Sequence, residues 1–136
     1  MKSTRKPPLI VVAGVFLRGD EVLACRRSQN KSAAGLWEFP GGKVELGEAP
    51  EAALVRELLE ELKIRVRVLE LIDRSVTRLD DITIDLSCYL VDASGIAPID
   101  STDHDLLRWV RRADLAALDW AGPDLPAVEA LMSRCP

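Results

Sequence analysis

Between Gly42 and Ile64 the chain reads GKVELGEAPEAALVRELLEELKI, and this stretch carries an unusual group of glutamates. On a helix, Glu57, Glu60 and Glu61 stand at i, i+3 and i+4, so their carboxylates share one face. Like charges at these spacings repel one another, and the helix dipole disfavours anions near a helix C-terminus. Folding alone does not favour such a group. A divalent cation does, because hard cations bind clustered oxygen ligands.

The same stretch predicts a helix over about residues 50 to 62. Pro50 is suited to the first turn of a helix. Apolar residues then recur at intervals of three, four and three, at Ala52, Val55, Leu59 and Leu62. At about 100° per residue these four lie on the side opposite the glutamates. We therefore expect a helix that buries this apolar side and presents its carboxylates on the other.

Apolar and alternating runs elsewhere in the chain predict the strands of a sheet. We expect strands at Leu9–Leu17, Glu21–Arg26, Arg65–Arg78, Ile82–Val91 and Leu106–Val110. The dipeptide Gly19-Asp20 is typical of a turn between the first two of these strands.

The remaining segments are predicted as loops and helices. Ser28–Gly35 is small and polar, which indicates a loop, and Leu36–Phe39 is a short apolar segment. Pro40-Gly41-Gly42 is then expected to break the chain. Further helices are expected at Arg112–Leu118 and Pro123–Arg134. This order of elements predicts an α/β protein, with helices packed on a mixed sheet.

Length, charge and cysteine content set the broad class. The 136 residues fit a single domain, residues 1–136, with a substantial core. The net charge of −4 argues against a general surface for a nucleic-acid polymer. A small phosphorylated substrate is still compatible, because a bound metal would offset its charge. The three scattered cysteines, Cys25, Cys88 and Cys135, favour neither a disulfide framework nor a zinc site, so we expect a reducing, cytoplasmic location.

The N-terminus resembles a signal peptide in outline, because Lys2, Arg5 and Lys6 precede the apolar run Leu9–Leu17. No small-residue cleavage site follows, since the run ends directly in Arg18-Gly19-Asp20-Glu21. The run is also too short to span a membrane. We therefore expect a buried strand here, and no membrane partner.

The glutamate-rich stretch fits the pattern G-x5-E-x7-R-E-U-x-E-E-x-G-U, where U is aliphatic, at every defined position except one. The fixed identities fall at Gly42, Glu48, Arg56, Glu57, Glu60 and Glu61. The stretch resembles the Nudix box of the Nudix hydrolase family. Ala34–Glu45 resembles the MutT-type subgroup, which includes CTP pyrophosphohydrolases and 8-oxo-dGTP diphosphatases. The likeness extends over nearly the whole chain.

The resemblance implies the Nudix fold, an α/β fold in which a mixed β-sheet is sandwiched between α-helices. It also implies hydrolysis of a nucleoside triphosphate to a monophosphate and pyrophosphate with Mg²⁺, for which Mn²⁺ can substitute. Expected substrates are damaged or modified nucleotides, such as 8-oxo-dGTP or 5-substituted cytidine triphosphates. ADP-ribose, a dinucleoside polyphosphate and a non-catalytic nucleotide-binding role stay open as alternatives, and so does the choice between monomer and homodimer.

The resemblance also implies a set of metal ligands. They are the carbonyl of Gly41 and the side chains of Glu57, Glu60, Glu61 and Asp103. Asp103 stands six residues before Trp109, where MutT-like enzymes carry a glutamate. Its shorter side chain leaves a plain polar loop as the alternative interpretation.

The catalytic residues implied by the resemblance are Glu57, Glu60, Arg56 and Glu48. Glu57 is the candidate general base, a role that a carboxylate near metal-bound water can fill. Arg56 is expected to pair with Glu48 and so to orient the loop and the helix.

Substrate-binding residues are implied at Arg26, Arg27, Glu38, Phe39 and Asp124. Arginine suits phosphate oxygens, although a solvent-facing strand end is the alternative for Arg26 and Arg27. An ionised Asp124 would accept hydrogen bonds from guanine N1–H and N2–H or from the cytosine amino group. Its alternative role is to cap the last helix.

Other single residues carry structural expectations. Lys63 replaces the glycine of the pattern, so we expect a left-handed C-cap that costs roughly 1–2 kcal/mol, partly recovered through the helix dipole. His104 is expected to be a loop histidine without a role. Cys25 and Cys88 are expected to be buried. The three tryptophans are expected in the core or at a pocket rim: Trp37, Trp109 and Trp120.

Overall fold

The sheet is built around β1 (Leu9–Arg18) in the computed structural model, which describes residues 6–29, 31, 33–98 and 100–134. β1 runs parallel to β6 (Thr83–Asp92) along most of its length. Its other edge pairs antiparallel with β4 (Gly41–Lys43) and, at its C-terminal end, with β2 (Glu21–Arg27). The predicted mixed sheet and the turn between the first two strands are confirmed.

The other strands extend this sheet on both sides. They are β3 (Trp37–Glu38), β5 (Arg67–Arg78) and β7 (His104–Arg111). The order is β3-β2-β1-β6-β5, with β7 paired to β2. β5 and β7 correspond to predicted strands whose ends are shifted by one or two residues, as strand ends often are.

The helices are α1 (Pro50–Leu62), η1 (Arg112–Ala117), η2 (Gly122–Asp124) and α2 (Leu125–Ser133). The predicted extent of α1 is confirmed. The segment predicted as a helix at Arg112–Leu118 is a 3₁₀ helix. The predicted terminal helix begins later than expected, because a 3₁₀ turn precedes α2.

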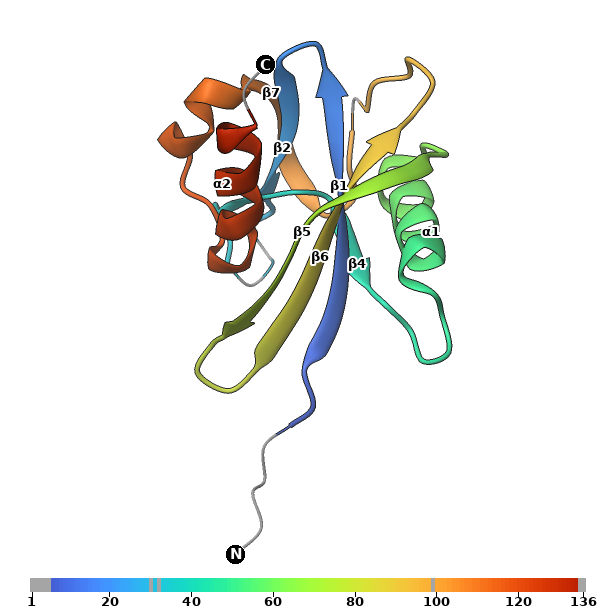
Figure 1. Ribbon diagram of the computed structural model, residues 1–136, viewed down its shortest axis with the longest axis vertical. Helices are drawn as coiled ribbons and strands as arrows, with labels where there is room; N and C mark the ends of the chain where they lie inside the picture. The colour runs from blue at the N-terminus through green and yellow to red at the C-terminus, as the bar shows by residue number, and fades with distance from the viewer. Residues whose placement is uncertain (1–5, 30, 32, 99, 135–136) are drawn as a thin grey trace, which may run out of the picture.

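The two α-helices cover opposite faces of the sheet (Figure 1). On one face, Leu54 and Leu58 of α1 pack in a core with strand residues such as Leu23. On the other face, Val128 and Leu131 of α2 pack in a second core. This arrangement confirms the expected sandwich of a mixed sheet between helices.

The predicted apolar side of α1 is wrong at two of its four residues, Ala52 and Leu59, and right at Leu62. The structure buries Ala53, Leu54, Leu58 and Leu62, whereas Ala52 and Leu59 are exposed. The prediction placed all three glutamates on the side of the helix opposite the core. The helix is instead rotated so that Glu61 shares the buried side with the leucines.

The predicted chain break at Pro40-Gly41-Gly42 is also wrong, because Gly41 and Gly42 belong to β4. A Cβ on Gly41 would collide with the carbonyl oxygen of Val12 in β1. Glycine is unfavourable in most strands but allows this close approach of two backbones. The glycines therefore form a strand that brings the chain beside α1.

The end of α1 is as expected from the departure at Lys63. This residue adopts the left-handed conformation, with φ 59° and ψ 31°. Its N–H donates to the carbonyl of Leu59, and its Nζ donates to the carbonyl of Glu60 at 2.8 Å. Lysine thus satisfies two carbonyls at the helix end while it holds a conformation that glycine adopts more readily.

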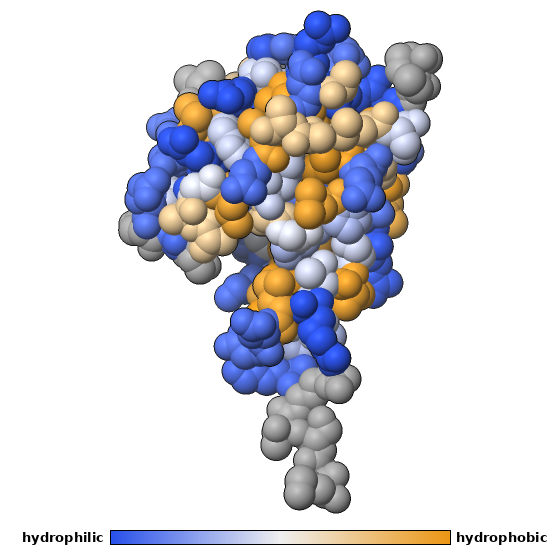
Figure 2. Space-filling view, turned by 90° about the vertical axis from the view of Figure 1, so that its left-hand side faces the viewer, coloured by the Kyte–Doolittle hydropathy of each residue, from blue (hydrophilic) through white to orange (hydrophobic). Residues whose placement is uncertain are grey.

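The surface carries exposed hydrophobic side chains on several elements, among them Leu69 and Val76 of β5 and Leu125 of α2. Figure 2 shows one side of the molecule, on which hydrophobic and hydrophilic side chains are interspersed. Within the residues that the structure describes, no helix has the length and apolar character needed to cross a membrane.

Several single-residue expectations are confirmed. Cys25 and Cys88 are buried free thiols, and Trp37 and Trp120 lie in the core. Cys135 lies outside the described residues, as do Lys2 and Arg5 of the signal-like segment.

Candidate active site

The three glutamates of α1 differ sharply in burial. The side chain of Glu60 is 62% exposed and that of Glu57 is 20% exposed, but that of Glu61 is only 3% exposed. The helix therefore does not present a solvated carboxylate face. Its three carboxylates range instead from mostly exposed at Glu60, through half-buried at Glu57, to buried at Glu61.

Glu61 is an orphaned buried carboxylate. Neither of its side-chain oxygens has a hydrogen-bond partner among the described residues. The pKa of Glu61 is raised to about 9, chiefly by burial and also by the charges of Asp103, Glu38 and Glu57, which Arg27 opposes. A buried carboxylate without a hydrogen-bond partner costs free energy that a cation could recover.

Glu57 lies between Gly42 and Arg56. Its carboxylate occupies the volume in which a Cβ on Gly42 would lie. Arg56 Nη1 donates to Glu57 Oε2 at 3.0 Å. Burial raises the pKa of Glu57, and the bond from Arg56 opposes the shift.

The predicted pair of Arg56 and Glu48 is confirmed. Arg56 donates to both oxygens of Glu48, at 2.8 Å and 3.0 Å, and its Nη2 also donates to the carbonyl of Lys43. The N–H of Glu45 donates to Glu48 as well. These bonds lower the pKa of Glu48 to about 2, with Arg56 as the largest cause. A single guanidinium thus joins the loop, β4 and α1.

Asp103 lies in the loop before β7 and pairs with Lys31 at 3.3 Å. Its charge raises the pKa of both Glu57 and Glu61. The N–H of Thr102 donates to the backbone carbonyl of Glu61, so the main chain of this loop is anchored to the end of α1.

The two arginines at the end of β2 have different partners. Arg27 Nη1 donates to both carboxylate oxygens of Glu38, at 3.0 Å and 3.1 Å. Arg26 donates instead to Asp105 at 2.8 Å, near the surface. Arg27 therefore belongs to the charge network that reaches Glu61, whereas Arg26 pairs with an acid of β7.

Asp124 is buried and binds the backbone just after β3 rather than capping a helix. Its Oδ2 accepts a hydrogen bond from the N–H of Phe39 at 3.0 Å, and it makes no side-chain cap to α2. Burial raises the pKa of Asp124 to about 8, although the bond from Phe39 opposes the shift. The ring of Phe39 packs on Trp120, with centroids 4.8 Å apart.

His104 is the residue that the sequence-based reasoning missed. It begins β7 instead of lying in a loop, and its side chain is 1% exposed. Its Nε2 lies 2.8 Å from Glu38 Oε2, and its Nδ1 lies 2.8 Å from Ser101 Oγ and 3.3 Å from Glu61 Oε1. A lone histidine between two aspartates carries no local signal of these distant partners.

Residues 8–131 match the protein-family model described as the NUDIX domain. The chain belongs to the Nudix family. The site is built on the Nudix box, Gly42–Ile64, and on residues that the sheet brings beside it.

Relatives of this Nudix protein cover most of its length. A Mycobacterium tuberculosis protein whose provisional name is 8-oxo-dGTP diphosphatase 2 is 44% identical over 85% of this chain and 82% of its own. The CTP pyrophosphohydrolase of Escherichia coli is 36% identical over 90% of each chain. The solution structure of MutT from Staphylococcus aureus is 31% identical, with a TM-score of 0.78, over 96% of this chain and 99% of its own.

The Nudix-box carboxylates have the chemistry of a divalent cation site. Glu61 provides two unsatisfied buried oxygens, and Glu57 is half-buried one helical turn away. Among the described residues, no three acidic, histidine or cysteine side chains already converge as ligands. Glu57 and Glu60 are instead held by Arg56, at 3.0 Å and 3.5 Å.

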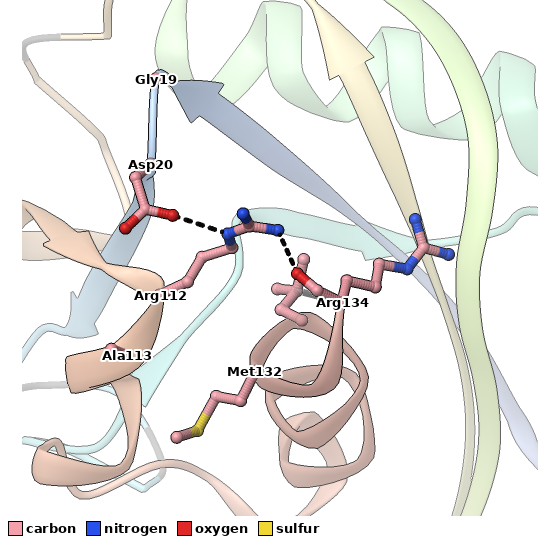
Figure 3. A pocket seen from close by; sticks show the side chains of 7 residues that line it. Gly19, Asp20, Arg112, Ala113, Met132 and Arg134 are labelled. Carbon is pink, nitrogen blue, oxygen red and sulfur yellow. Dashed lines mark hydrogen bonds and ion pairs between the residues drawn. The ribbon is translucent and has the colours of Figure 1, made fainter. Parts of the chain in front are cut away.

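An open depression of about 430 Å³ lies elsewhere, beside η1 and the end of α2 (Figure 3). Arg112 crosses it, donating to Asp20 at 3.0 Å and to the carbonyl of Arg134 at 2.8 Å. None of the Nudix-box residues lines it. Its one carboxylate, Asp20, is paired with Arg112, whereas Glu61 of the box has no hydrogen-bond partner, so the box is the candidate site.

Proposed function

We propose that this Nudix protein is a Mg²⁺-dependent nucleoside triphosphate pyrophosphohydrolase, which releases a nucleoside monophosphate and pyrophosphate. The observation that carries the proposal is the orphaned carboxylate of Glu61 beside half-buried Glu57, within a box that keeps all its charged residues. A non-catalytic binding protein has no need to keep such a costly group.

In this proposal the cation is held by the carboxylates of Glu57, Glu60 and Glu61 and by the carbonyl of Gly41, with Asp103 as a further acidic residue. When bound, Mg²⁺ supplies charge neutralisation of the phosphate oxygens and a lower pKa for a coordinated water. For Glu60, binding requires only a side-chain movement away from Arg56, since it is mostly exposed.

The protein groups divide the remaining work. Glu57 takes the proton of the attacking water, a role that a carboxylate beside the cation can fill. Arg56 and Glu48 fix the loop against the helix, so that the reacting groups are positioned before substrate arrives. Arg27 is placed to meet phosphate oxygens, with Arg26 nearer the surface.

The base is assigned to the region of Glu38, Phe39 and Asp124. Asp124 is buried against the N–H of Phe39, and the aromatic pair of Phe39 and Trp120 lies beside it. The relatives' names favour 8-oxo-dGTP or a cytidine triphosphate, including 5-substituted forms, as substrate. The biological role is then to clear damaged or modified nucleotides in the cytoplasm.

A nucleotide panel with Mg²⁺ tests the proposal. We expect the highest kcat/KM for 8-oxo-dGTP or a cytidine triphosphate, with pyrophosphate as the product. Glu61→Gln should remove most of the turnover and keep the fold. Glu129→Gln is the matched control, because Glu129 is an exposed glutamate of the other helix.

Two outcomes would contradict the proposal. If the protein hydrolyses ADP-ribose or a dinucleoside polyphosphate but no triphosphate, its substrate is another nucleoside diphosphate derivative. Nucleotide binding without any product would instead indicate a non-catalytic protein.

A further inference from the structure

His104 is a buried histidine that the proposed reaction does not use. It begins β7, and its side chain lies between Glu38 of β3 and Glu61 of α1. One of these glutamates lies on a strand and the other on a helix, and β4 separates the two elements along the chain. The histidine is therefore the point at which three separate elements meet at the site.

The hydrogen bonds assign the roles of the two ring nitrogens. Glu38 already accepts from Arg27 through both oxygens, so it is an acceptor, and His104 Nε2 donates to it at 2.8 Å. With the proton placed on Nε2, Nδ1 is the acceptor, and the Ser101 hydroxyl donates to it at 2.8 Å. Ser101 Oγ in turn accepts from the N–H of Asp103 at 3.3 Å.

This network connects the two halves of the site. On one side, Glu38 pairs with Arg27, the residue proposed to meet phosphate oxygens. On the other side, Glu61 Oε1 lies 3.3 Å from His104 Nδ1, and the Ser101 hydroxyl ties the histidine to the loop of Asp103. Moving the imidazole would take the Nε2 donor away from Glu38 and open the 3.3 Å contact between the ring and Glu61 Oε1.

We infer that His104 is a positioning residue, which holds Glu38 through Nε2 and limits the position of Glu61 by packing against it, and so couples the metal-binding side of the site to Glu38 and Arg27. The inference rests on the proposed function, in which Glu61 is a metal ligand. Substitution of a group that orients a metal ligand from outside the coordination shell typically lowers metal affinity by 10- to 100-fold.

The test measures Mn²⁺ affinity of the free protein by electron paramagnetic resonance, without substrate. We expect His104→Leu to weaken Mn²⁺ binding by roughly 10- to 100-fold. His104→Gln should bind more tightly than His104→Leu, because its amide nitrogen reaches the position of Nε2 and can donate to Glu38. Leu131→Ala is the control for lost stability, since Leu131 is buried in the core on the other face of the sheet.

Each outcome bears on a different claim. Equal Mn²⁺ affinity of the unaltered protein and His104→Leu would overturn the positioning role. Weaker binding by Leu131→Ala to the same extent would also overturn it, because the effect would then follow stability. If the unaltered protein neither binds Mn²⁺ nor hydrolyses any nucleotide, the proposed function itself fails.

A second pair of variants covers the case in which His104→Leu does not fold. His104→Gln places a donor near Nε2, whereas His104→Asn reaches only the position of Nδ1. The inference expects tighter Mn²⁺ binding by His104→Gln than by His104→Asn. Equal binding by the two variants, at the affinity of the unaltered protein, would overturn it.

Discussion

The carboxylate of Glu57 lies against the α-carbon of Gly42, in the volume where any other residue would carry its Cβ. One residue belongs to β4 and the other to α1, so the contact fixes the distance between strand and helix at the site. Glycine at this position serves the placement of a functional side chain rather than an unusual backbone conformation.

Gly42→Ala is expected to lower kcat by roughly 100-fold, because displacement of a reacting group by about 1 Å has effects of that size. The colliding atoms are the flexible end of Glu57, which can swing away, so the melting temperature should change little. Pyrophosphate release and thermal unfolding followed by circular dichroism measure the two effects. An active Gly42→Ala variant would show that the position of Glu57 is not critical.

Glu48→Gln is expected to lower stability at neutral pH but not in acid. The pKa of Glu48 is lowered to about 2 in the folded protein, so its contribution to stability is present above the unfolded pKa of about 4.5. That contribution is lost as the pH falls through about 2. Urea unfolding of both proteins between pH 7 and pH 3 should therefore show a difference that shrinks with acidity, whereas Glu129→Gln should show no such trend.

Asp124→Asn is expected to change the pH dependence of stability in the opposite direction. Burial raises the pKa of Asp124 to about 8, so its contribution is fully present below the unfolded pKa of about 4 and is lost as the pH rises through about 8. The variant should gain stability relative to the unaltered protein across this range, with a limiting slope of about 1.4 kcal/mol per pH unit.

The matched control for Asp124→Asn is Asp119→Asn, an exposed aspartate nearby. Thermal unfolding between pH 5 and pH 9 provides the comparison. A stability difference between the unaltered protein and Asp124→Asn that does not vary with pH would contradict the assignment of a neutral, buried carboxyl.

Lys63→Gly is expected to stabilise the protein by about 0.5–1 kcal/mol. Glycine removes the roughly 1–2 kcal/mol strain of a left-handed residue but costs some backbone entropy and the bond from Nζ to Glu60. Lys63→Ala keeps the strain and loses the bond, so it should be less stable than the unaltered protein. If urea unfolding shows Lys63→Gly to be less stable than Lys63→Ala, this account is refuted. We expect kcat to be unchanged in both variants.

Local patterns predicted the elements that bury one continuous face. The apolar run of β1 and the Gly19-Asp20 turn predicted the first two strands to within one residue of their ends. The pair of Arg56 and Glu48 was implied by the resemblance to the Nudix box, and the structure confirms it.

Tertiary contacts decided what the sequence left ambiguous. The leucine-rich helix has two apolar sides, and either could face the core. The side that is buried includes Glu61, which a prediction that keeps glutamates in solvent would not choose. Gly41 extends as a strand only because β1 lies close enough to pair with it. His104 finds Glu38 and Glu61 far along the chain, so no local pattern could reveal its role.

The loop that carries Asp103 is attached to α1 through the main chain, by the bond from the N–H of Thr102 to the carbonyl of Glu61. A main-chain attachment does not depend on which side chain follows it. Evolution can therefore exchange the acid at position 103 and explore other substrates there, while the loop keeps its register against the helix. The same attachment makes this loop a favourable place to begin a library for altered nucleotide preference.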